Sequence, residues 1–218
     1  MPITRLLHYI ALIILFGASI CGIYRYRRLD KAAKIFSVFI CLACIAETTS
    51  LIAARVWHNS MPVIAIYSLI EFAMISVYFN YSIDAFRKKN LGIYFAIGGI
   101  VLGILDILFL QPLNVFNSYY LFFEGIGIIS MSLFSFFRLL LKEEYLVLYK
   151  YPHFWFAAIL SFFWSVTFLN WGLRDYIYIH HAQSSKMLDV GIYIINILFY
   201  AMFACVFILY PKMKTENA

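Results

Sequence analysis

The chain alternates seven long apolar runs with short polar segments. The runs cover Leu6–Ile23, Ala33–Val56, Val63–Ile83, Leu91–Leu110, Ser118–Leu141, Phe154–Leu173 and Leu188–Tyr210. An α-helix needs about 20 apolar residues to cross roughly 30 Å of hydrocarbon at about 1.5 Å per residue. This pattern predicts an all-α fold, a polytopic membrane bundle of seven transmembrane helices. The runs leave room only for loops, so we expect residues 1–218 to form a single domain.

The composition supports a bilayer-embedded chain. Hydrophobic residues make up 64% of the sequence, aromatic residues 20% and charged residues 13%, whereas a soluble domain has about 45–50% apolar and about 25% charged residues. The aromatic content suits belts of Trp and Tyr at the two membrane interfaces. The four cysteines lie inside apolar runs, where they are expected to act as packing residues.

The basic residues predict the orientation of the bundle. Thirteen of the 17 Lys and Arg residues follow the first, third, fifth or seventh run. Basic residues are enriched in cytoplasmic loops, so we expect the N-terminus outside and the C-terminus in the cytoplasm. The net charge of +6 is spread over these short clusters and forms no continuous basic stripe, so no nucleic-acid partner is expected.

Five carboxyl residues inside the apolar runs are the most informative polar positions. Ionisable residues within membrane helices usually face a bundle interior or water, and they often serve a function. In the predicted orientation all five fall in the outer half of the membrane, with Glu71 about 12 Å deep and Glu124 about 9 Å deep. The five residues are Glu47, Glu71, Asp106, Glu124 and Asp189.

This arrangement predicts an outward-facing polar pocket. Its expected ligand-binding residues are the five carboxyls together with Tyr67, Asn170 and Arg174, and the polar residues Thr48, Thr49, Ser50, Ser68 and Asn196 are further candidates. Arg55 and Arg174 could neutralise part of the negative charge. The alternative is a structural role. In that case Asp106 and Asp189 are solvated near the interface, and Glu71 and Glu124 form hydrogen bonds between helices.

Several kinds of chemistry are not indicated. The seventh run lacks the lysine that a retinal Schiff base requires, and the chain contains no H-E-x-x-H motif. No pair of candidate ligands has the helical spacing of a metal site, so neither a metal nor another cofactor is expected. None of the five prolines lies inside a predicted helix, whereas many transporters interrupt helices at mid-membrane to bind substrate.

The fourth and fifth predicted helices each contain several glycines. Gly99 and Gly103 form a small-xxx-small pair, and Gly125 and Gly127 lie in the fifth run. Small residues allow close helix–helix approach. Packing within the chain is the expected use, and a homo-oligomer through the fourth or fifth helix is the alternative.

Three segments carry a resemblance to other proteins. They are Ile66–Phe72 (IYSLIEF), Phe116–Ser118 followed by Glu124, and Tyr151–Phe156 (YPHFWF). Together they resemble small seven-helix integral membrane proteins of Bacteroidota-type bacteria, which show an IYxxIEF-like third helix, an NS…E fifth helix and an NPxFW-like start of the sixth. Tyr151 replaces the usual Asn. The resemblance implies a multi-pass protein of the bacterial cytoplasmic (inner) membrane.

The resemblance also implies a role near two-component signalling, and it marks Tyr67, Glu71, Asn117, Glu124, Pro152 and Trp155 as positions of interest. The leading hypothesis is a sensory, receptor-like or accessory module that acts through a partner protein in the lipid bilayer. Two alternatives stay open: a small transporter or proton-coupled carrier, and an intramembrane lipid-modifying enzyme.

Overall fold

The computed structural model describes residues 3–141, 150–172, 177 and 182–215, which form helices and connecting turns without a strand. The long helices are α1 (Ile3–Arg25), α2 (Lys31–Val56), α3 (Met61–Ser82), α5 (Leu91–Leu105), α6 (Ser118–Leu140), α7 (Pro152–Gly172) and α9 (Ala182–Thr215). Within these described ranges, seven segments are long and apolar enough to cross a membrane, which confirms the predicted number of spans. This is the architecture of a multi-pass membrane protein.

The structure differs from the prediction at several helix ends. A short helix α4 (Asp84–Lys89) precedes α5, a π-helical turn η2 (Asp106–Leu110) extends α5, and a 3-10 turn η1 (Tyr26–Arg28) follows α1. Helix α9 continues through Pro211, so the prediction that every proline lies outside the helices was wrong there. Proline removes one backbone hydrogen bond and is disruptive in a helix interior; at Pro211 only the last turn follows.

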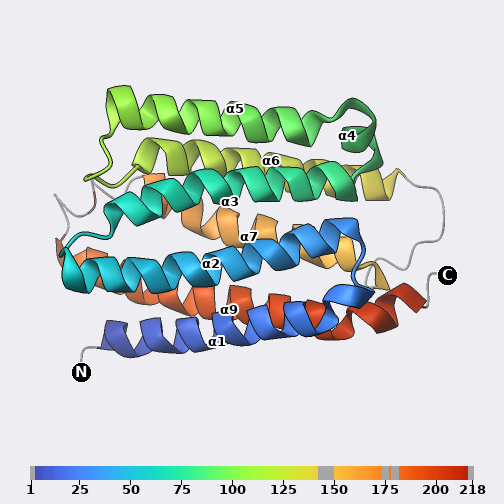
Figure 1. Ribbon diagram of the computed structural model, residues 1–218, viewed down its shortest axis with the longest axis horizontal. Helices are drawn as coiled ribbons and strands as arrows, with labels where there is room; N and C mark the ends of the chain where they lie inside the picture. The colour runs from blue at the N-terminus through green and yellow to red at the C-terminus, as the bar shows by residue number, and fades with distance from the viewer. Residues whose placement is uncertain (1–2, 142–149, 173–176, 178–181, 216–218) are drawn as a thin grey trace.

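Six of the helices enclose an interior. Contacts run in order from α1 to α2, to α3, to α6, to α7 and to α9, and α9 packs back on α1. Helix α5 lies outside this ring and packs mainly on α3 (Figure 1). The chain leaves the ring after α3 and re-enters it with α6, so the fourth span is the peripheral one.

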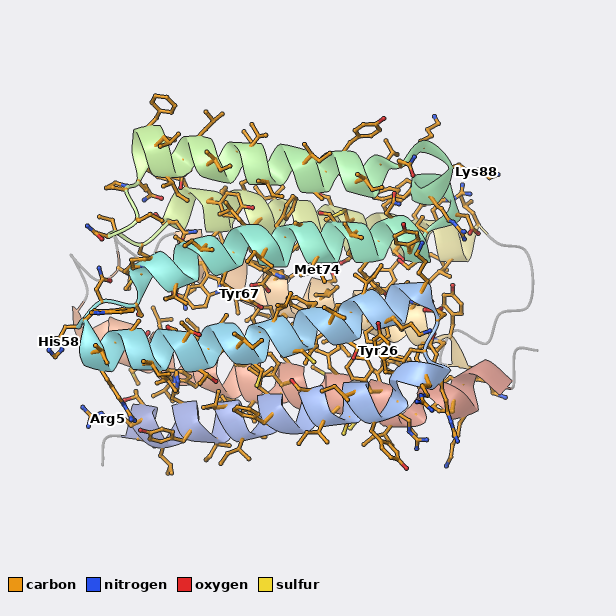
Figure 2. The ribbon with its side chains drawn as sticks, viewed as in Figure 1. Arg5, Tyr26, His58, Tyr67, Met74 and Lys88 are labelled. Atoms are coloured by element: carbon orange, nitrogen blue, oxygen red, sulfur yellow. The ribbon has the colours of Figure 1, made fainter. Side chains whose placement is uncertain are left out.

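The helices run along the long axis of the bundle, and the two termini lie at opposite ends (Figure 1). We call these the N-terminal end, where α1 begins, and the C-terminal end, where α9 finishes. Figure 2 shows Arg5 and His58 at the N-terminal end and Lys88 at the C-terminal end. Most basic residues of the described chain lie at the C-terminal end, in η1, in α4 and in the helix ends beside them.

Aromatic side chains fill the ring interior in its C-terminal half. The Phe36 ring of α2 lies 4.8 Å from that of Phe156 on α7, 4.6 Å from that of Phe203 on α9 and 5.1 Å from that of Tyr78 on α3, centroid to centroid. All four side chains are fully buried. Because aromatic rings contribute large contact areas, this aromatic layer leaves the C-terminal half of the interior closed.

The glycines of α5 serve packing within the chain. A Cβ atom at Gly99 would overlap the Phe72 ring of α3, and one at Gly103 would lie 2.8 Å from Leu69. The small-xxx-small face is therefore already occupied by α3. This is the expected use of such a face, and a homo-oligomer would need another surface of α5 or α6.

Candidate functional site

A cavity of about 770 Å³ occupies the ring interior in its N-terminal half. Residues of α1, α2, α3, α7 and α9 line it, joined by Phe116 and Leu121 from the start of α6. Its rim includes Thr4, Ser60 and Met61, which lie at helix ends. The cavity therefore reaches the N-terminal end of the bundle, whereas the aromatic layer closes the other half.

Two glutamates lie deep in this cavity. Glu71 is ten residues beyond the start of α3, so it lies about 15 Å along that helix. Glu47 is nine residues before the end of α2, which gives about 14 Å from the same end of the bundle. No lining residue of α3 lies deeper than Glu71.

The two glutamates belong to a larger polar cluster. Tyr67, one turn before Glu71 on α3, interacts electrostatically with Glu47, Glu71, Glu124 and Tyr200. Figure 2 shows Tyr67 near the middle of the bundle. Tyr200 of α9 interacts in turn with Glu47 and Glu71. Side chains from four helices thus meet at the inner end of the cavity, and we call these five residues the carboxyl–tyrosine cluster.

Glu124 lies in the wall behind the cavity. It is completely buried on α6, it interacts electrostatically with Glu71, and it is not a lining residue. Neither of its carboxyl oxygens has a hydrogen-bond partner among the described residues, and the nearby Tyr120 hydroxyl also lacks one. A buried carboxylate without a hydrogen-bond partner is costly, so this arrangement favours the neutral, protonated form of Glu124.

The rim carries charges of both signs. Arg5 and His8 come from the first turns of α1, Arg55 from the last turn of α2 and Asp189 from α9. The Arg55 guanidinium donates a hydrogen bond to the Tyr9 hydroxyl, so this contact joins α2 to α1 at the cavity entrance.

The eight predicted ligand-binding residues separate into distinct groups. Glu47, Tyr67, Glu71 and Asp189 line the cavity, and Glu124 is the member of the cluster that lies outside the lining. Asp106 and Asn170 are not lining residues. Arg174 lies outside the described residues.

Topology explains why Asp106 is apart from the other carboxyls. It lies on η2 at the end of α5, which packs outside the ring, and its carboxyl oxygens are buried without a hydrogen-bond partner among the described residues. The position of a residue along its helix could be predicted from the sequence, but the position of that helix inside or outside the ring could not.

The smaller polar residues divide in a similar way. Thr48 and Thr49 donate hydrogen bonds to the carbonyls of Cys44 and Ile45 on their own helix, a common arrangement for a hydroxyl within a helix. Ser50, Ser68 and Asn196 line the cavity. The Ser68 hydroxyl also accepts a hydrogen bond from Asn117 Nδ2 at 2.8 Å, which fixes the start of α6 against α3.

Sequence reasoning missed a second polar group, at the C-terminal end. The Asp30 carboxylate lies 2.7 Å from His153 Nε2, and the other ring nitrogen, Nδ1, lies 3.2 Å from the Tyr78 hydroxyl. In a neutral His153, Nε2–H donates to Asp30 and Nδ1 accepts from Tyr78. We call these three residues the Asp–His–Tyr chain; it connects α2, α7 and α3.

Asp30 is also the N-cap of α2, since its other carboxyl oxygen accepts a hydrogen bond from the Ala33 amide at 2.8 Å. Partial burial opposes ionisation, but the hydrogen bond and charge of His153 hold the pKa of Asp30 well below its usual range. Burial raises the pKa of the neighbouring Tyr151. The available sequence signal was an Asp directly before a helix start, which is typical of an N-cap.

Within the described ranges, no three His, Cys, Asp or Glu side chains come together in a way that could hold a metal ion. Comparison of the chain with protein-family models, curated proteins and solved structures found no match.

Proposed function

We propose that this chain is a sensory or accessory module of a bacterial cytoplasmic membrane, which binds a small molecule in its cavity from the extracytoplasmic side. The main observation behind this proposal is the cavity of about 770 Å³, which reaches only the N-terminal end of the bundle. This volume is in the range of small-molecule sites, roughly 300–1,000 Å³. The basic residues around Arg27 and Lys88, at the other end, support a cytoplasmic C-terminal end.

The closed C-terminal half favours binding over conduction. A carrier or ion path usually needs polar groups along the whole depth of the membrane, and the interior beyond the cavity is filled by Phe36, Phe156 and Phe203. Binding of a ligand in the cavity would therefore act on the C-terminal end of the bundle through movement of the helices. We propose that a partner protein in the membrane receives this movement.

Labelling of an introduced cysteine tests this proposal. In a background in which the four native cysteines are replaced by Ala, Asn196→Cys places a thiol in the cavity wall. We expect membrane-impermeant methanethiosulfonate reagents, added to spheroplasts, to modify this thiol without lysis. The matched control is Lys88→Cys, exposed at the opposite end, which should react only after lysis.

Lack of reaction at Asn196→Cys in intact spheroplasts would exclude an outward-open cavity. Reaction of Lys88→Cys before lysis would reverse the proposed orientation. Reconstituted protein that moves solutes between compartments would favour the transporter alternative, and turnover of an added lipid would favour the enzyme alternative.

A further inference from the structure

We infer that the ligand of this cavity is an amphipathic organic cation, a protonated amine with an aromatic or aliphatic body, whose charge lies beside Glu71. The inference rests on the proposed function, because it names the ligand class of the same cavity. It follows from the distribution of charge, aromatic rings and space within the cavity.

The charge of the cavity changes with depth. Its basic lining residues, Arg5, His8 and Arg55, belong to the terminal turns of α1 and α2 at the rim. At the inner end lie Glu47 and Glu71, which make no ion pair with any residue in the described part of the chain. A buried carboxyl is neutralised either by a proton or by a counter-charge, so an ammonium ligand at the inner end can take the place of the proton.

Glu124 strengthens this preference. It places a third carboxyl against Glu71, and the Glu124 oxygens accept no hydrogen bond from a described residue. When Glu71 is ionised, its negative charge lies at the cavity's inner end among the other carboxyls. A cation bound there neutralises this charge in a place where water screens it poorly.

Aromatic rings surround the same position. Tyr67, Tyr200 and Trp164 line the inner end, and the rings of Phe163 and Phe199 stack there at 4.1 Å between centroids. The faces of such rings attract ammonium groups, most strongly when water is excluded. Carboxylates combined with aromatic faces suit an organic ammonium better than a metal ion, which requires several oxygen ligands at fixed distances.

The size and the rim determine the rest of the ligand. The cavity is far larger than an ammonium group, and Ile64, Leu121 and Ile192 supply apolar lining for a hydrophobic body. The two arginines at the rim can donate hydrogen bonds to a hydroxyl or anionic group at the outer end of the ligand.

Three probes of nearly equal shape test the inference: 4-phenylbutylamine, 4-phenylbutanol and 4-phenylbutyrate, which are cationic, neutral and anionic at pH 7. The reporter is Asn196→Cys in the cysteine-free chain, in nanodiscs, reacted with neutral N-ethylmaleimide. We expect the amine to slow this reaction at roughly tenfold lower concentration than either other probe. Glu71→Gln should abolish that preference.

The controls separate charge from folding. Asp106→Asn removes another buried carboxyl, outside the cavity lining, and should leave the preference for the amine unchanged. If Glu71→Gln does not give a monodisperse protein, Glu47→Gln serves in its place, because Glu47 lines the same inner end.

The inference is overturned if the alcohol or the butyrate protects the thiol as well as the amine does. It is also overturned if neutralising Glu71 or Glu47 leaves the preference for the amine unchanged. Those outcomes leave a small-molecule cavity in place. An Asn196→Cys thiol that does not react even without a probe would instead contradict the proposed function itself. The inference is also overturned if Asp106→Asn reduces protection by the amine as much as Glu71→Gln does, since the charge at Glu71 would then not be the cause.

Discussion

At the scale of single residues, Phe72 shows how closely α3, α5 and α6 approach one another. Its ring is almost fully buried between Gly99 of α5 and Gly127 of α6. A Cβ atom at Gly127 would lie 2.7 Å from this ring, and one at Gly99 would overlap it. Because a ring held on both sides cannot move away, both positions require glycine for packing.

Two adjacent glycines provide a matched test of this packing. We expect Gly99→Ala to lower the free energy of unfolding by about 1–3 kcal/mol, the usual cost of overpacking a core. A Cβ atom at the exposed Gly98 would meet no other atom within 4 Å, so Gly98→Ala should be neutral or slightly stabilising, since alanine favours helix. Thermal unfolding in detergent measures both variants. Equal effects of the two substitutions would show that α5 does not pack on Phe72 as described.

At the scale of elements, the Asp–His–Tyr chain fixes the beginnings of two helices. Asp30 caps α2, and His153 lies in the first turn of α7. The Asp30 backbone amide also lies 3.5 Å from the Tyr210 hydroxyl of α9. One short connection between α1 and α2 is thus joined to α7 and α9 through polar contacts, which hold the C-terminal end of the ring closed.

The lowered pKa of Asp30 predicts how this contact depends on pH. A carboxyl whose pKa is lower in the folded protein stabilises the fold above its unfolded pKa of about 4, and this stabilisation is lost as the pH falls towards the folded value. Asp30→Asn keeps a capping side chain but removes the charge. Since Asp30 is 37% exposed, we expect a loss of only about 1 kcal/mol at pH 6.

Thermal unfolding of the wild type and Asp30→Asn, measured between pH 6 and pH 3, checks this prediction. The difference between the two melting temperatures should narrow as the solution becomes more acidic. Asp84→Asn, a change of the same kind at an exposed residue of the same end, serves as the control for general charge effects. A difference that stays constant down to pH 3 would contradict a stabilising charge at Asp30.

At the scale of the whole molecule, the bundle is asymmetric along its axis. One half of the ring interior is an aromatic layer and the other half is a cavity, and the described basic residues concentrate at the end of the aromatic layer. In the orientation that we propose, with the basic loops in the cytoplasm, the cavity opens outwards. The orientation of the bundle therefore decides which side of the membrane can supply a ligand to the cavity.

Epitope tags at the two ends of the chain test this orientation. In spheroplasts we expect an antibody to reach an N-terminal tag before lysis and a C-terminal tag only after lysis, because seven spans place the ends on opposite sides. A cytoplasmic protein detected only after lysis controls for leakage. Detection of both tags before lysis would mean an even number of spans.

The sequence by itself determined the number of spans, the all-α class and the positions of the carboxyls along their helices. These properties depend on hydrophobicity and on a constant rise per residue, so they can be read locally. Glu47 and Glu71 could accordingly be placed at similar depth. The Asp–His–Tyr chain was missed because its members are far apart in the sequence and lie at the ends of different helices.

Only the tertiary structure decided which residues of equal depth meet. Depth says nothing about the direction of a side chain around the bundle axis, which is set by the packing of each helix on its neighbours. Glu71 faces the cavity and Glu124 lies behind it, whereas Asp106 is held apart on the helix that the ring excludes. The cavity itself exists because six helices close a ring that their side chains fill in only one half.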